Sequence, residues 1–232
     1  MKIQSIFIVS HLKEYHSKRL HTFLNNLIQT KLDNIKIYLF MSDNINFTQI
    51  KEIKNIVSSL NLEIILYDNS IQLTTTMFEN ILKFKLNEYQ TILILESDCA
   101  IDKLFLSKIN DDLASYNNIW IYGSYYYGIS NWIGKDYIKR FHMNGVAVYN
   151  RTNDFISFLN SIIYNSNNNY DLVITYKLRE KNMFLKKTVD SKYILNLSPI
   201  CDNNVSLNYK DYKENTCILH TKNEKLLSKL LN

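Results

Sequence analysis

The feature that most constrains this fold is a short apolar run that ends in two carboxylates. Residues 91–95 read Thr-Ile-Leu-Ile-Leu, and Glu96 and Asp98 follow at once. An uninterrupted run of Ile and Leu is typical of a strand buried on both faces, as in the parallel sheets of α/β proteins. Such sheets bind ligands outside the carboxyl ends of their strands. The sequence therefore predicts that Glu96 and Asp98 lie where a ligand binds.

Strand patterns and helical patterns alternate through the first half of the chain. A strand pattern over Ile3 to Val9 is followed by a helical pattern over 14–30. The same alternation continues with strands at 35–41, 62–67 and 91–95 and with helices at 48–60, 74–86 and 103–116. It predicts an α/β fold with a parallel sheet and right-handed crossovers.

The acidic pair suits a hard divalent ion, which takes oxygen ligands. An ion held by only one or two carboxylates typically completes its shell with water and with phosphate oxygens of a substrate. A nucleoside diphosphate would supply those oxygens. One alternative stays open, because acidic residues after a strand are also turn formers or N-caps, here for the helix expected near Lys103.

All four glycines of the chain lie in one window, residues 123–145. Glycine allows positive φ and a close approach of backbone to ligand, so this window favours an irregular, site-forming segment. Aromatic side chains crowd the same region and could stack on a sugar or a base. Ordinary turns and aromatic core packing are the alternatives. Later patterns predict a strand at 146–149, a helix at 152–164, a patterned segment at 170–178 and a terminal helix at 223–231.

Length and composition are those of one globular domain. A chain of 232 residues with 46% hydrophobic content can build a full core. No apolar run approaches the ~20 residues that cross a bilayer, and residues 1–10 lack the long apolar core and cleavage site of a signal peptide. We therefore expect a single domain over 1–232, in a cytoplasmic protein with no transmembrane segment.

Charge and cysteine content narrow the function classes further. The formal net charge of +5 is modest and spread along the chain, so no nucleic-acid partner is expected. Cys99, Cys201 and Cys217 lack the spacing of a zinc site or a disulfide framework. They are expected to be buried thiols.

Four features occur in order along the chain: the βα repeats, Glu96-Ser97-Asp98, the segment His142-Met-Asn-Gly-Val-Ala-Val-Tyr149 and the segment Cys217-Ile-Leu-His-Thr-Lys222. Together they resemble the GT-A class of nucleotide-sugar glycosyltransferases. The resemblance implies a three-layer α/β/α sandwich with a mostly parallel central sheet. It also identifies the acidic pair as a DxD motif, which holds a divalent metal on the donor diphosphate. The first position departs from the usual Asp, so Asp98 is expected to bind directly and Glu96 directly or through water.

The resemblance implies further ligands near the end of the chain. His220 matches a late histidine that completes the metal shell in some members, and Lys222 matches a basic residue near the diphosphate. Imidazole is a good ligand for Mn²⁺ and a poor one for Mg²⁺, so His220 favours manganese, with Mg²⁺ as the alternative. A histidine on a short apolar strand can instead be a packing residue.

The sugar and acceptor site is also implied by the resemblance. In many of these enzymes a strand like 142–149 lies under the donor sugar and the acceptor, which assigns His142, Asn144 and Gly145 to that site. The Asn144 amide can bridge sugar hydroxyls, and Gly145 leaves room for the ring. An Asn-Gly hairpin turn is the alternative. Asp171 matches by order the catalytic base of inverting members, and a helix N-cap is its alternative.

The donor site is assigned by position alone. In the resembled class the loops after the first strands hold the nucleobase and ribose. The donor-binding residues expected here are Ser10, His11, Asp43, Asp68, Ser97 and Lys222. Residues of these types at strand ends are also common turn formers. Residues 1–98 should thus form the nucleotide-binding half, and residues 99–232 the acceptor-side half with the C-terminal metal-ligand segment.

The expected activity is divalent-metal-dependent transfer of a hexose-like sugar from a nucleoside diphosphate, UDP being favoured, to a hydroxyl group. A glycan, a lipid-linked or a peptide acceptor fits equally. A sugar nucleotidylyltransferase would carry a glycine-rich loop after the first strand, and a dehydrogenase would carry GxGxxG there. Residues 10–15 contain no glycine. A non-catalytic sugar-nucleotide or glycan-binding protein on the same fold stays open.

Overall fold

The computed structural model describes residues 1–11, 15–32, 34–67, 81–82, 90–125, 143–162, 170–196 and 215–220. Most of the helix expected at 74–86 and all of the terminal helix expected at 223–231 lie outside these residues. None of the helices within them has the length and the apolar character that crossing a membrane requires.

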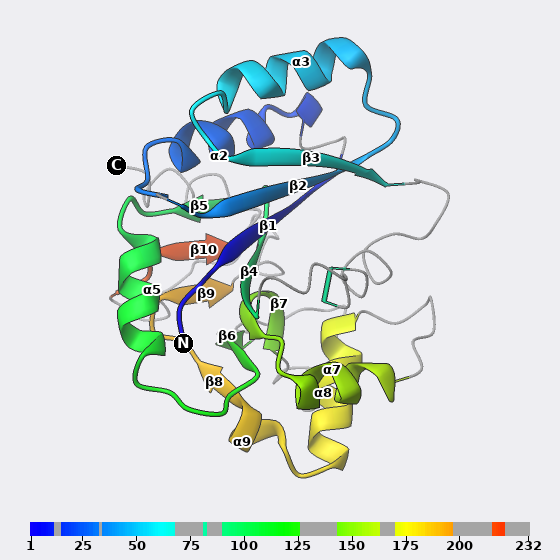
Figure 1. Ribbon diagram of the computed structural model, residues 1–232, viewed down its shortest axis with the longest axis vertical. Helices are drawn as coiled ribbons and strands as arrows, with labels where there is room; N and C mark the ends of the chain where they lie inside the picture. Colours follow the sequence, from blue (N-terminus) through cyan, green and yellow to red (C-terminus); the bar gives the residue numbers. More distant parts are fainter. Residues whose placement is uncertain are drawn as a thin grey trace, which may run out of the picture.

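Seven strands of the described chain form one central sheet (Figure 1). In chain order they are β1 (Ser5–Ser10), β2 (Lys36–Ser42), β3 (Leu62–Tyr67), β4 (Thr91–Glu96), β6 (Ile121–Tyr125), β7 (Met143–Asn150) and β8 (Thr188–Asp190). Their order across the sheet is β3-β2-β1-β4-β7-β6-β8. Only β7, among these strands, runs antiparallel to both of its neighbours. The sheet is therefore mostly parallel, as predicted, with a reversed strand that the sequence pattern did not indicate.

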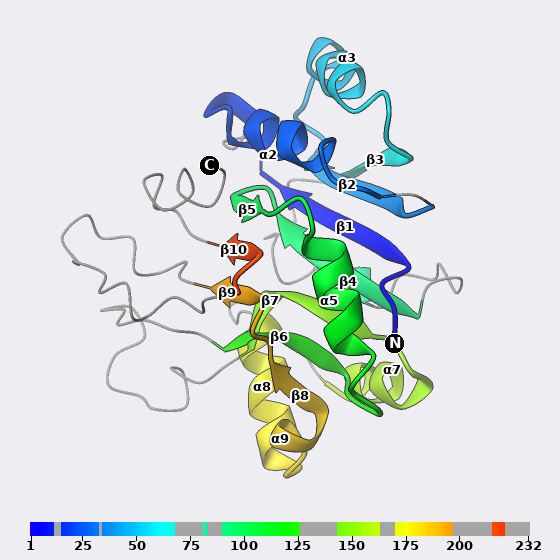
Figure 2. The same cartoon turned by 90° about the vertical axis from the view of Figure 1, so that its left-hand side faces the viewer.

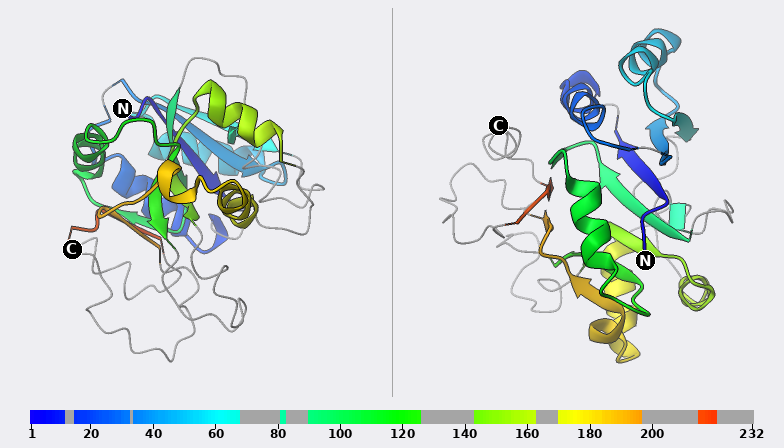
Figure 3. Two further views of the ribbon diagram at one scale, coloured as in Figure 1. Left: turned by 90° about the horizontal axis from the view of Figure 1, so that it is seen from below. Right: turned by 60° about the vertical axis from the view of Figure 1, so that its left-hand side comes forward.

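Helices cover both faces of this sheet, so the fold has three layers (Figure 2). The described helices are α2 (Arg19–Leu27), α3 (Phe47–Ile56), α5 (Phe105–Leu113), α7 (Asn153–Asn160), α8 (Tyr170–Glu180) and α9 (Phe184–Lys187). Alternate side chains of β1 enter two cores: Ile6 and Ile8 pack on the side of α2, α3 and α5, whereas Phe7 and Val9 pack on the side of α7 and α8. Figure 3, left, shows α5 and α7 on opposite sides of the sheet.

Local chemistry sets where the first helices begin. Leu20, Phe23, Leu24 and Leu27 bury one face of α2, as their helical spacing predicts. Residues 15 and 16 are also helical, but α2 itself begins at Arg19, because Lys18 has φ 64°, in the left-handed region that interrupts a helix. Asn46 and Gln49 form a reciprocal capping box at the start of α3, with bonds of 3.0 and 2.8 Å.

A second, smaller sheet lies beside the carboxyl end of β4 (Figure 2). It consists of β5 (Cys99–Ile101), β10 (Ile218–His220) and β9 (Ile194–Asn196), in the order β5-β10-β9. β10 is antiparallel to β5 and parallel to β9. Because β5 follows β4 after a two-residue turn, this sheet brings the end of the described chain next to the acidic pair.

Candidate metal and nucleotide site

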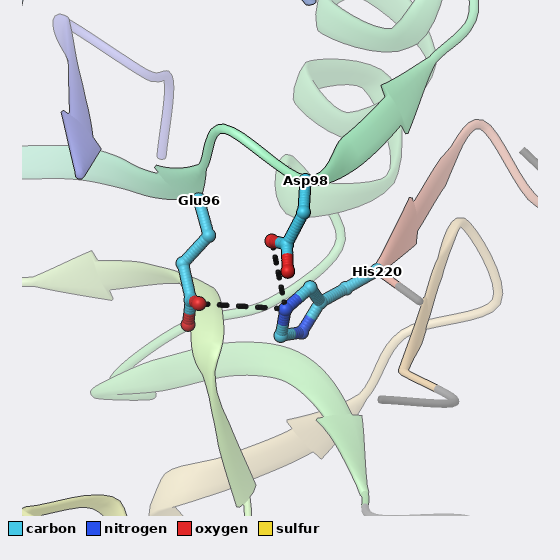
Figure 4. A group of neighbouring side chains, drawn as sticks. All are labelled: Glu96, Asp98 and His220. Atoms are coloured by element: carbon cyan, nitrogen blue, oxygen red, sulfur yellow. Dashed lines mark ion pairs between the residues drawn. The ribbon is translucent and has the colours of Figure 1, made fainter. Parts of the chain in front are cut away.

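Glu96, Asp98 and His220 converge at the carboxyl end of β4 (Figure 4). Glu96 is the last residue of β4, Asp98 directly precedes β5, and His220 ends β10. The Nε2 atom of His220 lies 3.2 Å from Oδ1 of Asp98 and 3.5 Å from Oε2 of Glu96. One ligand atom from each residue lies within 4.8 Å of the others. The structure thus brings together the three residues chosen from the sequence as metal ligands.

Hydrogen bonds fix the turn that carries the two acids. The Ser97 amide donates to the Val9 carbonyl at 3.0 Å, and the Ser97 hydroxyl donates to the Ser10 hydroxyl at 2.9 Å. Both serine side chains are buried. On the other side, β5 and β10 pair with His220 opposite Cys99. The acidic turn is therefore held between the end of β1 and the small sheet.

The electrostatics of the triad fit a cation. Asp98 and His220 are buried, and the Glu96 side chain is 29% exposed. Burial disfavours a charged imidazole, but the negative charges of Glu96 and Asp98 outweigh burial and hold the pKa of His220 well above its usual value. A buried carboxylate needs such a positive partner.

A divalent ion could take over this role. Two carboxylates and one neutral imidazole are donors that Mn²⁺ accepts, and binding would displace the imidazole proton. The residues present therefore fit the metal that the sequence analysis predicted, and Mn²⁺ suits the imidazole better than Mg²⁺ does.

The predicted donor residues fall into three groups. Ser10 and Ser97 are buried and bonded to each other, so their hydroxyls hold β1 to the acidic turn. His11 is half-buried and Asp43 is exposed, after the carboxyl ends of β1 and β2. Asp68 and Lys222 lie outside the described residues. Contact of any of these side chains with a nucleotide stays a prediction.

The predicted sugar site is described only in part. His142 and the Asn144 side chain lie outside the described residues, but the backbone of Asn144 and Gly145 lies inside β7. The alternative of a two-residue Asn-Gly hairpin is therefore wrong. A Cβ at Gly145 would collide with the hydroxyl of Tyr170, so the space beside this glycine is filled by that side chain. Contact of Gly145 with a sugar stays a prediction.

Asp171 lies in the first turn of α8, where its Oδ1 accepts a hydrogen bond from the Leu172 amide at 2.8 Å. Asp171 is thus the second residue of the helix and not its N-cap, and this position does not exclude catalysis. Burial is the main cause that raises the pKa of the neighbouring Tyr170, and Tyr149 and the charge of Asp171 add to it. The start of α8 packs on β7, where the Tyr170 hydroxyl lies against Gly145. The sequence analysis did not select Tyr170 as a site residue. A glycine at position 145 is compatible with a large side chain packed against it, but it does not show which side chain that is.

No protein-family model matches the sequence, and no curated protein matches it either. Solved structures do match. TarS 1-349 from S. aureus, in complex with UDP-GlcNAc, has a TM-score of 0.58 at 13% identity, with 97% of this chain and 59% of that chain covered. Mouse xyloside xylosyltransferase 1 has a TM-score of 0.59 at 10% identity, with 95% and 97% covered. This chain has the GT-A glycosyltransferase fold.

A third structure with this fold is the mannosyltransferase PcManGT from Pyrobaculum calidifontis, in complex with GDP-Man and Mn²⁺. Its TM-score is 0.55 at 10% identity, with 82% of this chain covered. This chain spans 59% of the length of TarS 1-349 and 55% of the length of PcManGT. The GT-A fold and the α/β fold class predicted from the sequence are confirmed. The two cores described above lie between the central sheet and the helices on either side of it.

Proposed function

We propose that the chain is a divalent-metal-dependent glycosyltransferase, which moves a sugar from a nucleoside diphosphate to a hydroxyl acceptor. The observation that carries the proposal is the triad of Glu96, Asp98 and His220 at the carboxyl end of β4. In a sheet of this type that edge is where ligands bind. TarS and PcManGT, which share the fold, were solved with a sugar nucleotide, and PcManGT also with Mn²⁺.

The triad would hold the metal against the donor diphosphate. Asp98 and His220 are buried and well fixed, so they supply the direct ligands, and Glu96 binds directly or through water. When bound, the ion acts as a Lewis acid that neutralises the charge of the departing diphosphate. We assign the nucleotide to the half formed by residues 1–98, with His11 and Asp43 at its edge and UDP as the favoured nucleotide.

The acceptor would bind on the side of residues 99–232. The general base in this proposal is Asp171, which takes the proton from the acceptor hydroxyl as its oxygen attacks the anomeric carbon. Asp171 follows Tyr170, whose hydroxyl lies against Gly145 of β7, and this place at the start of α8 supports the assignment. The acceptor class is a hydroxyl on a glycan, a lipid-linked sugar or a peptide.

Calorimetry with UDP and GDP, with and without Mn²⁺, tests the proposal. Nucleotide affinity should rise strongly with Mn²⁺ and fall to the metal-free value in EDTA, because the ion and the diphosphate share coordination. The matched control is Asp102→Asn, which removes a charge just after β5 that pairs with Lys108 at 3.3 Å. That variant should keep the manganese effect.

Hydrolysis of UDP-sugars and GDP-sugars, followed as nucleotide release, then separates an enzyme from a binding protein. Slow release from at least one sugar nucleotide is expected. Tight binding of every donor with no release, with or without candidate acceptors, would favour the non-catalytic alternative. Equal nucleotide affinity in Mn²⁺ and in EDTA would contradict the proposed metal dependence.

A further inference from the structure

The imidazole of His220 presents its two nitrogens to different surroundings. Nε2 faces the carboxylates of Asp98 and Glu96, at 3.2 and 3.5 Å (Figure 4). Nδ1 is also buried, and it has no hydrogen-bond partner among the residues that the structure describes. When Nε2 is a metal ligand, the ring proton must sit on Nδ1. A metal-bound histidine almost always donates that proton to an oxygen.

The ladder of the small sheet shows which side chains flank the ring. His220 pairs with Cys99 of β5 on one side and with Asn196 of β9 on the other. Residues paired in register point to the same face of a sheet, so the three side chains form one row. Asn196 is fully buried, and Cys99 nearly so.

Only one member of that row is a good acceptor. The thiol of Cys99 accepts hydrogen bonds only weakly. The amide of Asn196 carries a carbonyl oxygen, a strong acceptor with two lone pairs. The backbone of Asn196 is fixed, because its amide donates to the buried Ser124 hydroxyl at 3.1 Å.

We propose that Asn196 is a positioning residue for the metal site, whose side-chain oxygen accepts the Nδ1 proton of His220 when Nε2 binds the ion. This inference rests on the proposed metal site. Asn196 would fix the tautomer and the orientation of the ring and would make Nε2 a better ligand. It acts through His220 and touches neither the metal nor the substrate.

Calorimetric titration of the full chain with Mn²⁺ alone tests the inference. Asn196→Leu keeps the size of the side chain but removes the acceptor, and it should weaken Mn²⁺ binding by roughly tenfold to a hundredfold. Asn196→Asp keeps an oxygen acceptor and should bind Mn²⁺ as tightly as the unaltered protein. The matched control Cys99→Ala, from the opposite side of the row, should also keep its affinity.

The outcomes separate this inference from the proposed function. Absence of Mn²⁺ binding by the unaltered chain would overturn both. Tight binding by the unaltered chain and unchanged binding by Asn196→Leu would overturn the inference alone, as would an equal loss in Cys99→Ala.

A spectroscopic measurement covers the case in which Asn196→Leu does not fold. In the Zn²⁺-loaded protein, which is diamagnetic, the Nδ1 proton of His220 should give a slowly exchanging NMR signal. That signal should move downfield in Asn196→Asp, because a carboxylate is the stronger acceptor. A signal that does not move would overturn the inference.

Discussion

The two sheets of this protein differ in size and in how they are held, yet each supplies part of the triad. Six of the seven strands of the central sheet have five to eight residues, and β4 is covered on both faces. The small sheet, which supplies His220, has three strands of three residues each. A metal ion between the sheets would therefore bind a rigid pair of acids and a histidine on a much shorter ladder. This difference predicts that the ion stabilises the small sheet more than the central one.

Removing one ligand from the acidic turn after β4, or the ligand from the small sheet, gives the largest expected effect. Asp98→Ala and His220→Ala should each abolish the manganese-dependent part of UDP or GDP affinity and leave the metal-free part unchanged, because the ion and the diphosphate share ligands. Calorimetry in Mn²⁺ and in EDTA measures both parts. If only Asp98→Ala has this effect, His220 is not a metal ligand, and the ion is not expected to stabilise the small sheet.

Asp171→Asn should lower turnover by about a hundredfold or more and leave nucleotide affinity nearly intact, since a general base acts only in the chemical step. Donor turnover with a saturating acceptor measures this, once an acceptor is known. The hydrogen bond to the Leu172 amide needs only an oxygen, which asparagine retains. Near-normal turnover would thus make Asp171 a residue of the helix start and nothing more.

Hydrogen exchange compares the sheets directly. Without metal, the amides of β10 should exchange faster than those of β1, because a three-residue strand opens locally at low cost. Mn²⁺ at ten times its dissociation constant should slow the β10 amides by about tenfold, since each opening must release the ion. The amides of α3, which lie outside the site, should keep their rates. Equal slowing in β10 and α3 would argue against a local effect.

The smallest effect concerns Cys217, which directly precedes β10. Burial is the main cause that raises the pKa of this thiol to about 12. The unfolded thiol ionises above about pH 8.5. The contribution of this protonated thiol to folding stability is therefore fully present below that pH, and it decreases as the pH rises toward 12. Between pH 7.5 and 9.5 the unaltered protein should lose about 1 kcal/mol more unfolding free energy than Cys217→Ala, as measured by urea titration.

The long elements could be predicted from the sequence because their patterns repeat. The strand expected at 62–67 matches β3, and those expected at 35–41 and 91–95 match β2 and β4 within one residue. The helix expected at 14–30 is interrupted before Arg19, because a left-handed residue such as Lys18 leaves no mark in an apolar pattern. Strands of three residues, such as β5 and β9, are too short to show a period, so the small sheet was not predicted.

The candidate site divides in the same way. The acidic pair follows from the buried run of β4 and the general rule for parallel sheets. His220 was chosen only through the resemblance to the GT-A class, since no spacing links residues 98 and 220. Tyr170 was missed because its contact with Gly145 depends on how α8 packs on β7, which a linear pattern does not contain. The direction of β7 was missed for a related reason: an apolar run does not show which way a strand runs.

The reversal of β7 places two different parts of the chain at one edge of the sheet. β4 ends where β7 begins: the pairing of the two strands stops at Ile94 and Ala147, two residues before Glu96 and two residues after Gly145. If β7 were parallel to β4, its carboxyl end, and not its amino end, would lie next to the carboxyl end of β4. Variation at the amino end of β7 can therefore change what faces the acidic pair while β1, β2 and β4 stay as they are. For protein engineering, this start of β7 is a place where the surroundings of the acidic pair can be altered without rebuilding the first half of the central sheet.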